Sequence, residues 1–199
     1  KEDVENKEDI ADKYFPMLAH TYEPSSDKKK KNDITFPCYV QPKLDGLRCV
    51  MYRNAGKIVC QSRTGSYFET MTHITEELTP FFSKNNVVLD GELYTNDIPF
   101  EELAGLIKKK KITDNDMVKL RYVKYHVYDI IDSSKTYCDR YNYITSHIDN
   151  MYKYVVSVPT YVATADNFKK FFGEFIENGY EGIMLRNMNG MYRCNYRRV

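Results

Sequence analysis

Short runs in which hydrophobic and polar residues alternate are the main pattern along this chain, and they predict β-strands. The stretch RCVMYRNAGKIVCQSR at 48–63 alternates on both sides of Asn54-Ala55-Gly56, which predicts a β-hairpin. Further strand-like runs cover 36–44, 87–95, 118–131 (one strand or two), 155–162 and 181–187.

Four other segments carry hydrophobic residues at helical spacing. Their apolar stripes are Met71, Ile74, Leu78 and Phe81; Phe100, Leu103, Ala104 and Ile107; Tyr141, Ile144, Ile148, Met151 and Val155; and Phe168, Phe171, Phe172 and Phe175. Gly179 after Asn178 predicts the end of the last helix. We expect a short helix in the polar segment 1–15 and an exposed loop over 25–35. Strands outnumber helices and are often adjacent in sequence, which favours an α+β fold.

Composition indicates one soluble globular domain. The chain has 199 residues, of which 42% are hydrophobic and 29% are charged, and no run is long enough to cross a bilayer. The polar N-terminus is neither a signal peptide nor a transit peptide. Five scattered cysteines without a CxxC pair argue against a zinc site and favour an intracellular, reducing compartment.

The distribution of charge excludes a globally basic nucleic-acid binder, because the net charge is only +1. The lysine runs at 28–31 and 108–111 are interpreted as solvated loops, which is what such runs usually are. The arginines of YRCNYRRV at 192–199 are better candidates for phosphate contacts, because aromatic residues are interleaved with them.

Charged residues and glycine interrupt four of the predicted strands. They are Lys43-Leu44-Asp45-Gly46, Asp90-Gly91-Glu92, Tyr128-Asp129 and Glu181-Gly182. If these breaks converge, the set suits a nucleoside triphosphate, because carboxylates bind Mg²⁺, arginines bind phosphate and an aromatic ring stacks on a base. No GxxxxGK[ST] loop is present and no Ser–His–Asp arrangement stands out. A lysine outside such a loop can instead be a nucleophile, provided that its amine is unprotonated.

The segment KLDGLR at 43–48 is similar to KxDGxR, the nucleotidyl-lysine motif of ATP-dependent DNA ligases. Further pieces follow in the order of that family, and PMLAHTYE at 16–23 resembles the segment that precedes its nucleotide pocket in phage and viral ligases. These pieces are SRTG at 62–65, LDGELY at 89–94, YHVYDI at 125–130 and EGIMLRN at 181–187. The resemblance covers about four-fifths of the chain. It implies an α+β nucleotidyltransferase (ATP-grasp-like) fold with antiparallel sheets flanked by helices.

The resemblance also implies a reaction. Lys43 would attack the α-phosphate of ATP, release pyrophosphate and hold AMP, which then passes to the 5′-phosphate of a DNA nick for sealing by the 3′-hydroxyl. Asp45 and Arg48 would orient the lysine and contact the ribose or the 5′-phosphate of the DNA. The partners implied are ATP and nicked double-stranded DNA, with no membrane partner and a monomeric state.

Individual roles in binding follow from the same resemblance. The implied nucleotide-binding residues are Gln41, Asp45, Gly46, Arg48, Arg63, Glu92, Tyr128 and Arg186. Glu92 would accept hydrogen bonds from the ribose and Tyr128 would stack on adenine, although a core tyrosine is an alternative in a chain with 18 tyrosines. Glu181 and Asp90 would bind Mg²⁺, and Asp90 would also support its strand. Arg63 and Arg197 would contact phosphates of DNA or nucleotide.

The end of the sequence departs from the family, which continues into a strand with two lysines that bind the α-phosphate and then into an OB-fold domain. We therefore expect a lead-in with a polar loop over 1–35 and a C-terminally incomplete adenylation domain over 36–199. Such a chain would bind ATP but adenylate itself weakly.

Other functions stay open at this level. An mRNA-capping guanylyltransferase shares the KxDG lysine, but SRTG and the arginine after EGIML favour a ligase. RNA ligases typically depart from the full KxDGxR pattern, and an NAD⁺-dependent ligase needs a domain that does not fit ahead of Lys43. A catalytically incomplete nucleotide- or DNA-binding domain is the alternative from a different class. Abundant Tyr, Lys and Asn resemble the composition of viral or phage ligases.

Overall fold

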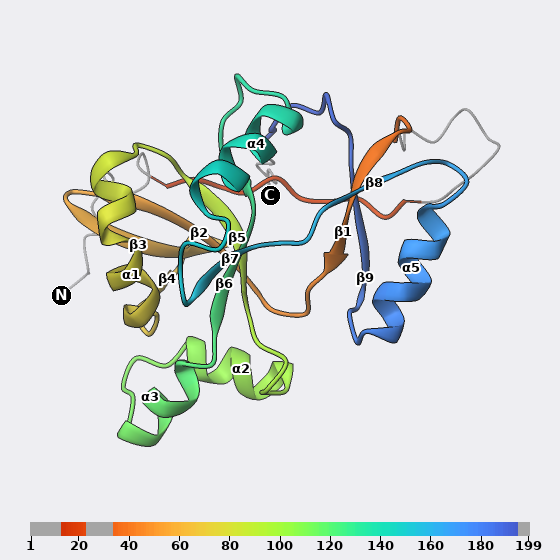
Figure 1. The fold of residues 1–199 in the computed structure, drawn as a ribbon. Helices are drawn as coiled ribbons and strands as arrows, with labels where there is room; N and C mark the ends of the chain where they lie inside the picture. The colour runs from red at the N-terminus through yellow and green to blue at the C-terminus, as the bar shows by residue number, and fades with distance from the viewer. Residues whose placement is uncertain (1–12, 23–33, 195–199) are drawn as a thin grey trace.

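Two β-sheets lie side by side in the computed structural model, which describes residues 13–22 and 34–194 (Figure 1). Within these residues the chain forms nine strands and five helices. One sheet has three strands in the order β8-β1-β9, and the other has six in the order β4-β3-β2-β5-β6-β7. All neighbouring strands are antiparallel except β6 and β7, which confirms the α+β fold with antiparallel sheets flanked by helices.

The six-stranded sheet is built around the predicted hairpin. Its strands are β2 (Leu47–Asn54), β3 (Lys57–Ser62), β4 (Tyr67–Phe68), β5 (Leu89–Tyr94), β6 (Lys124–Ile130) and β7 (Val155–Ser157). Asn54 pairs with Lys57, so Ala55 and Gly56 alone form the turn, with φ angles of 47° and 80°. Positive φ at both turn residues matches the twist of the strands, which is why this short turn closes the hairpin.

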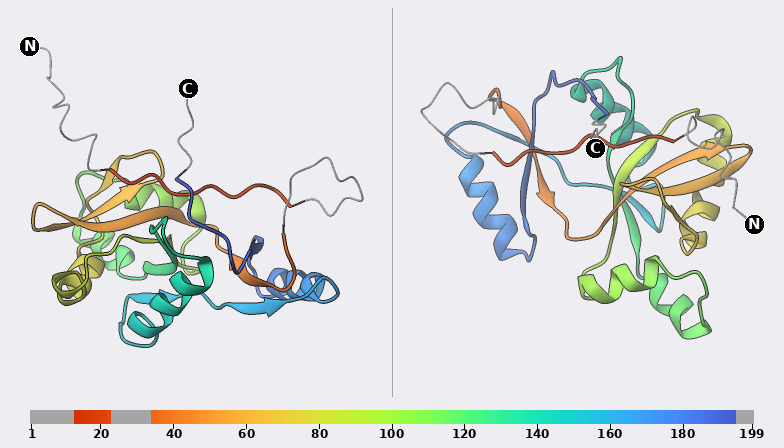
Figure 2. Two further views of the ribbon diagram at one scale, coloured as in Figure 1. Left: turned by 90° about the horizontal axis from the view of Figure 1, so that it is seen from above. Right: turned by 180° about the vertical axis from the view of Figure 1, so that it is seen from behind.

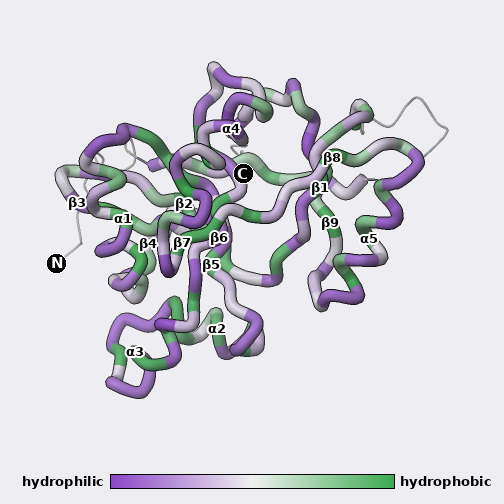
Figure 3. The backbone as a smooth tube through the Cα atoms, viewed as in Figure 1, coloured by the Kyte–Doolittle hydropathy of each residue, from purple (hydrophilic) through white to green (hydrophobic). Residues whose placement is uncertain are grey.

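The larger hydrophobic core lies between this sheet and its helices. These are α1 (Thr72–Lys84), α2 (Phe100–Ile107), α3 (Asp114–Leu120) and α4 (Tyr137–His147). Ile74 and Leu78 of α1 and Leu103 of α2 are fully buried with Leu93 of β5. Figure 3 shows hydrophobic positions recurring along β5 and β6, whereas many turns and outer helix positions are hydrophilic.

The three-stranded sheet has a smaller core of its own. Its strands are β1 (Cys38–Lys43), β8 (Tyr161–Ala163) and β9 (Gly182–Arg186), and α5 (Phe168–Glu177) packs Phe175 against Cys38 and Val40. The predicted helix end at Gly179 is confirmed, because Gly179 has φ 85° and its N–H donates to the Ile176 carbonyl. The Tyr180 N–H donates to the Phe175 carbonyl at 3.0 Å, which completes a Schellman motif.

The prediction of one or two strands over 118–131 is wrong at its first residues. They belong to α3, and the strand begins only at Lys124. The Thr113 hydroxyl accepts from the Asp116 N–H while the Asp116 carboxylate accepts from the Thr113 N–H. This capping box starts a helix where the alternation of apolar residues indicated a strand.

The apolar stripe predicted for α4 extends too far. The helix ends at His147, Met151 is 63% exposed and Val155 begins β7. The single strand predicted over 155–162 is two strands in different sheets, because Pro159 separates β7 from β8.

The segment 13–22 runs in extended form across both sheets (Figures 1 and 2). Tyr14 bonds to Gln61 of β3, and the Tyr22 ring packs on Phe168 of α5. Residues 13–15 are not helical, and the rest of the helix predicted over 1–15 lies outside the described residues. Most of the loop predicted over 25–35 lies outside them too. No helix in the described ranges is long and apolar enough to cross a membrane.

Candidate functional site

Lys43 ends β1 at the point where the chain passes from the small sheet to the large one. Its Nζ lies 2.7 Å from Oε2 of Glu181, and the two side chains are 45% and 49% exposed. Pairing of β1 with β9 sets Lys43 opposite Gly182, and the Glu181 N–H donates to the Lys43 carbonyl at 3.1 Å. The backbone of two strands thus holds an accessible amine beside an accessible carboxylate.

Gly46 brings the connection between the sheets against β5. A Cβ at this position would lie 2.4 Å from the Leu93 carbonyl oxygen and 2.9 Å from Cγ of Glu92, closer than any side chain tolerates. The KxDG turn therefore needs glycine for a close approach to the strand that carries Glu92. Asp45 beside it is exposed.

Arg48 lies on β2 and forms a two-pronged ion pair with Asp90 of β5. Nε and Nη2 of Arg48 each lie 2.7 Å from one oxygen of Asp90, and Nη2 also donates to the Met17 carbonyl. The Tyr192 hydroxyl donates to Oδ2 of Asp90 at 2.7 Å. Asp90 is fully buried, so its charge serves to hold Arg48. Its role as a Mg²⁺ ligand stays a prediction, which these bonds disfavour because both oxygens already have partners.

Glu92 and Tyr128 face each other across β5 and β6. The Tyr128 hydroxyl donates to Oε2 of Glu92 at 3.1 Å. Burial raises the pKa of Glu92 to about 7, against the opposing effect of the Arg48 charge and of this hydrogen bond. The guanidinium carbons of Arg48 and Arg186 lie 5.2 and 5.1 Å from the centre of the Tyr128 ring. The Tyr128 ring thus lies against charged side chains and not within the hydrophobic core. Its stacking on adenine remains a prediction.

Gln41 and Arg186 belong to a buried polar network. Arg186 Nε donates to Oε1 of Gln41 at 2.8 Å, and its Nη1 donates to Asp129 at 3.1 Å. Gln41 is 1% exposed and its amide also donates to the hydroxyls of Tyr137 and Thr160. Both residues lie near the predicted base platform, Tyr128, and direct contact with a nucleotide stays a prediction.

Arg140 is a site-supporting residue that the sequence analysis missed, and Asp129 received no role there. The Arg140 side chain is 1% exposed, and its Nε donates to Asp129 at 2.7 Å while Nη1 donates to the carbonyls of Lys135 and Gly190. Burial raises the pKa of Asp129, opposed by Arg186 and Arg140. A possible signal was an arginine in the first turn of a predicted amphipathic helix, 11 residues after a strand-end aspartate.

Arg63 lies apart from this cluster. It is exposed in the turn between β3 and β4, and in the described ranges no hydrogen bond or ion pair joins it to Lys43. Ser62, the last residue of β3, pairs with Cys49 of β2. The turn that carries Arg63 therefore begins beside the strand position next to Arg48. Arg197 lies outside the described residues.

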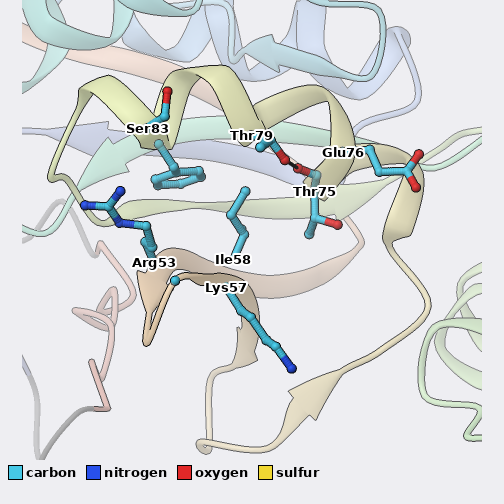
Figure 4. Close-up of a pocket in the computed structure, with 9 residues that line it drawn as sticks. Arg53, Lys57, Ile58, Thr75, Glu76, Thr79 and Ser83 are labelled. Atoms are coloured by element: carbon cyan, nitrogen blue, oxygen red, sulfur yellow. Dashed lines mark hydrogen bonds between the residues drawn. The ribbon is translucent and has the colours of Figure 1, made fainter.

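A shallow hollow of about 430 Å³ lies between α1 and the β2–β3 hairpin (Figure 4). Arg53, Lys57, Thr75 and Glu76 are among its lining residues, and none of the predicted site residues is. In the described part of the chain no three His, Cys, Asp or Glu side chains are grouped to hold a metal. A cation at Lys43 would therefore depend on Glu181 together with oxygens of a ligand, as Mg²⁺ does when it is bound through substrate phosphates.

The family profile described as "ATP dependent DNA ligase domain" matches residues 16–199 of this chain. A DNA ligase of African swine fever virus is 29% identical over 196 residues, which cover 92% of this chain and 42% of the viral protein. A probable DNA ligase of Dictyoglomus turgidum is 25% identical over 176 residues, covering 80% of this chain and 29% of that protein. The chain thus spans less than half of the length of these curated relatives.

Solved structures show the same fold. A Chlorella virus DNA ligase-adenylate matches with a TM-score of 0.64 at 22% identity, covering 90% of this chain and 62% of that chain. An ATP-dependent DNA ligase from bacteriophage T7, in complex with ATP, matches with a TM-score of 0.63 at 14% identity, covering 81% and 60%. The likeness confirms the expected nucleotidyltransferase architecture.

Proposed function

This chain belongs to the ATP-dependent DNA ligase domain family, and we propose on that premise that Lys43 is the residue that takes AMP from ATP. The observation that carries the proposal is the position of Lys43. Its amine is accessible at the end of β1, in a turn that Gly46 fixes against β5 and beside the only carboxylate that forms an ion pair with it in the described residues. Residues 36–199 would form the adenylation domain.

In the proposed reaction the unprotonated amine of Lys43 attacks the α-phosphorus of ATP. A nitrogen–phosphorus bond forms, the bond from phosphorus to the bridging oxygen breaks, pyrophosphate leaves and the amine gives up a proton. AMP then passes to the 5′-phosphate at a DNA nick, and the 3′-hydroxyl displaces AMP as the phosphodiester forms. The partners of this reaction are ATP and nicked double-stranded DNA, and the protein acts as a monomer.

Glu181 occupies the Lys43 amine, since its Oε2 lies 2.7 Å from Nζ. A cation bound to Glu181 would compete with the amine for this carboxylate. Mg²⁺ suits such a site, because it prefers carboxylate and phosphate oxygens, and it would also neutralise charge on the phosphates.

The rest of the site would bind the nucleotide. Glu92, which is half-buried next to Tyr128, would accept from the ribose hydroxyls, and Tyr128 would support the base. Arg48, positioned by Asp90, would contact phosphate or ribose beside Lys43. Arg186 and Gln41 would shape the base side of the pocket through their bonds around Tyr128 and Tyr137. Asp45 and Gly46 complete the turn, and Arg63 and Arg197 would contact phosphates of the DNA.

A labelling experiment tests the proposal. The protein is incubated with Mg²⁺ and α-labelled ATP, GTP or NAD⁺, and label that survives denaturation is measured for the unmodified protein, Lys43→Ala and Lys57→Ala. We expect transfer from ATP that is lost in Lys43→Ala and kept in Lys57→Ala, because Lys57 lies exposed beside the β2–β3 turn. Label from GTP alone would indicate a guanylyltransferase. Label that persists in Lys43→Ala would show that another residue is the nucleophile.

A further inference from the structure

Two basic side chains from separate segments contact Tyr67 of β4, and the turn directly before β4 carries a third basic residue. Nζ of Lys13 lies over the Tyr67 ring, 5.2 Å from its centre. Nζ of Lys110, in the loop between α2 and α3, donates to the Tyr67 carbonyl at 3.5 Å. Arg63 lies in the turn directly before β4. Tertiary folding, and not one lysine run, gathers these charges.

The arrangement is held by backbone and packing contacts. Ser62 and Ser66 close the Arg63 turn with a backbone hydrogen bond of 2.7 Å. The stem of Lys13 packs on this turn, since its Cδ would lie 3.6 Å from a Cβ at Gly65. The Thr70 hydroxyl donates to the Ile107 carbonyl at 2.7 Å and so fixes the lysine loop beside β4.

The surface has an excess of positive charge. Glu69 is the one carboxylate that forms an ion pair with Lys110 in the described residues, at 3.4 Å, and both side chains are about two-thirds exposed. An ion pair this exposed is weak, so a phosphate can replace the carboxylate. Lys109 in the same loop is committed to Asp116 through both carboxylate oxygens, whereas Lys111 is exposed beside Lys110.

The segment that begins at Lys13 connects the basic surface to Arg48. Four residues after Lys13, the Met17 carbonyl accepts from Arg48 of the KxDGxR segment. Four extended residues span at most about 14 Å, which corresponds to about four base pairs of duplex at 3.4 Å each. The backbone of Lys13 therefore lies within about four base pairs' length of duplex from the Met17 carbonyl that Arg48 contacts.

We propose that Lys13, Lys110 and Lys111, together with Arg63 around Tyr67, bind the phosphate backbone of the DNA duplex a few base pairs from the nick. This inference rests on the proposed ligase function and adds to it a surface outside the nucleotide pocket. Contacts to phosphate carry no sequence information, so the surface fixes the position of the duplex without selecting its sequence.

The test is the salt dependence of DNA binding by two triple variants. Lys13→Ala/Lys110→Ala/Lys111→Ala removes the surface, and Lys153→Ala/Lys169→Ala/Lys170→Ala removes the same charge from exposed positions before β7 and on α5. Binding to a nicked duplex is measured by anisotropy over a range of salt concentrations. Each lost phosphate contact lowers the slope of log K against log salt by about 0.9. We therefore expect a decrease of about 2 to 3 and at least a tenfold weaker affinity near 0.1 M salt for the first triple variant, and no change for the second.

Three further measurements separate the outcomes. Shortening the duplex arms to fewer than about four base pairs should abolish the difference between the first triple variant and the unmodified protein. Equal slopes for the two triple variants would overturn the proposal. It would also be overturned if the first triple variant lost affinity for poly-glutamate, a polyanion without phosphate, but kept its affinity for DNA. Labelling of Lys43 from ATP is measured in parallel. If label is absent from every variant, the proposed ligase function fails, whereas label with unchanged DNA binding refutes only this surface.

Discussion

Folding places the Glu92 carboxylate in an environment that changes its chemistry. It occupies a strand position, and β2 and β6 lie on either side of it with Arg48 and His126 as its partners in register. Burial raises the pKa of its carboxyl from 4.5 to about 7. Glu92 is thus a group that gains or loses a proton near neutral pH, in a place where a ligand hydroxyl is expected.

This pKa predicts how stability depends on pH. Over the range from about 4.5 to 7, folded Glu92 keeps a proton that the unfolded chain has lost. The free energy of unfolding should therefore fall as the pH rises through this range, by up to about 1.4 kcal/mol per pH unit from this group. Glu92→Gln should remove that part of the slope in urea unfolding curves, since an amide does not titrate.

The control is Glu177→Gln, which changes an exposed carboxylate at the end of α5 and should leave the slope as it is. The interpretation is wrong if Glu92→Gln and the unmodified protein show the same slope.

At the scale of elements, α4 is important because it carries Arg140 into the space beneath β6 and β9. Asp129 of β6 receives Arg140 on one side and Arg186 of β9 on the other, at 2.7 and 3.1 Å. One carboxylate thus joins a helix, a strand of the large sheet and a strand of the small sheet. Asp129 and Arg140 are buried and the Arg186 side chain is only 13% exposed, so water solvates these charges poorly.

Removal of Arg140 should therefore be costly. Arg140→Met leaves Asp129 buried with one cationic partner, and we expect the free energy of unfolding to fall by about 3–5 kcal/mol. Lys119→Met breaks an exposed pair with Glu102 and should leave stability nearly unchanged. Urea unfolding of both variants measures the contrast. Similar losses for the two variants would mean that burial does not set the strength of the Arg140 pair.

For the whole molecule, the two ends of the described chain meet over the site. The Tyr192 hydroxyl accepts from the Met17 N–H at 2.8 Å and donates to Asp90 at 2.7 Å. Arg48 contacts both Met17 and Asp90. The segment 13–22, which crosses both sheets, is thus tied to the residue that follows the lysine turn.

Tyr192→Phe tests this connection. The variant removes the acceptor of the Met17 N–H and one of the two donors to Oδ2 of Asp90, which keeps its bond from Arg48. The free energy of unfolding should therefore fall by about 1–3 kcal/mol. Hydrogen exchange at the Met17 amide should become faster. Tyr161→Phe, at a half-exposed ring of β8, should change neither quantity. Unchanged exchange at Met17 in Tyr192→Phe would show that the segment is held by other contacts.

Elements with a local and strong pattern could be predicted from the amino-acid sequence. The hairpin at 54–57, the stripe of α1 and the glycine end of α5 follow from alternation, helical period and positive φ, which depend on near neighbours. The order of the polar breaks in strands also placed Lys43, Glu92 and Glu181 in one family pattern, and Glu181 does lie beside Lys43.

The pairing of charges could not be predicted in this way, because it follows from how the elements pack together. Asp90 and Asp129 look alike in sequence, as carboxylates in apolar strands. Asp90 is buried against Arg48, 42 residues away, whereas Asp129 pairs with Arg140, 11 residues away, and with Arg186, 57 residues away. The contacts of Lys13 and Lys110 with Tyr67 were equally invisible, because both lysines are far from Tyr67 in sequence. Ion pairs and buried hydrogen bonds depend on sheet order and on crossing segments, which local patterns of hydrophobicity do not specify.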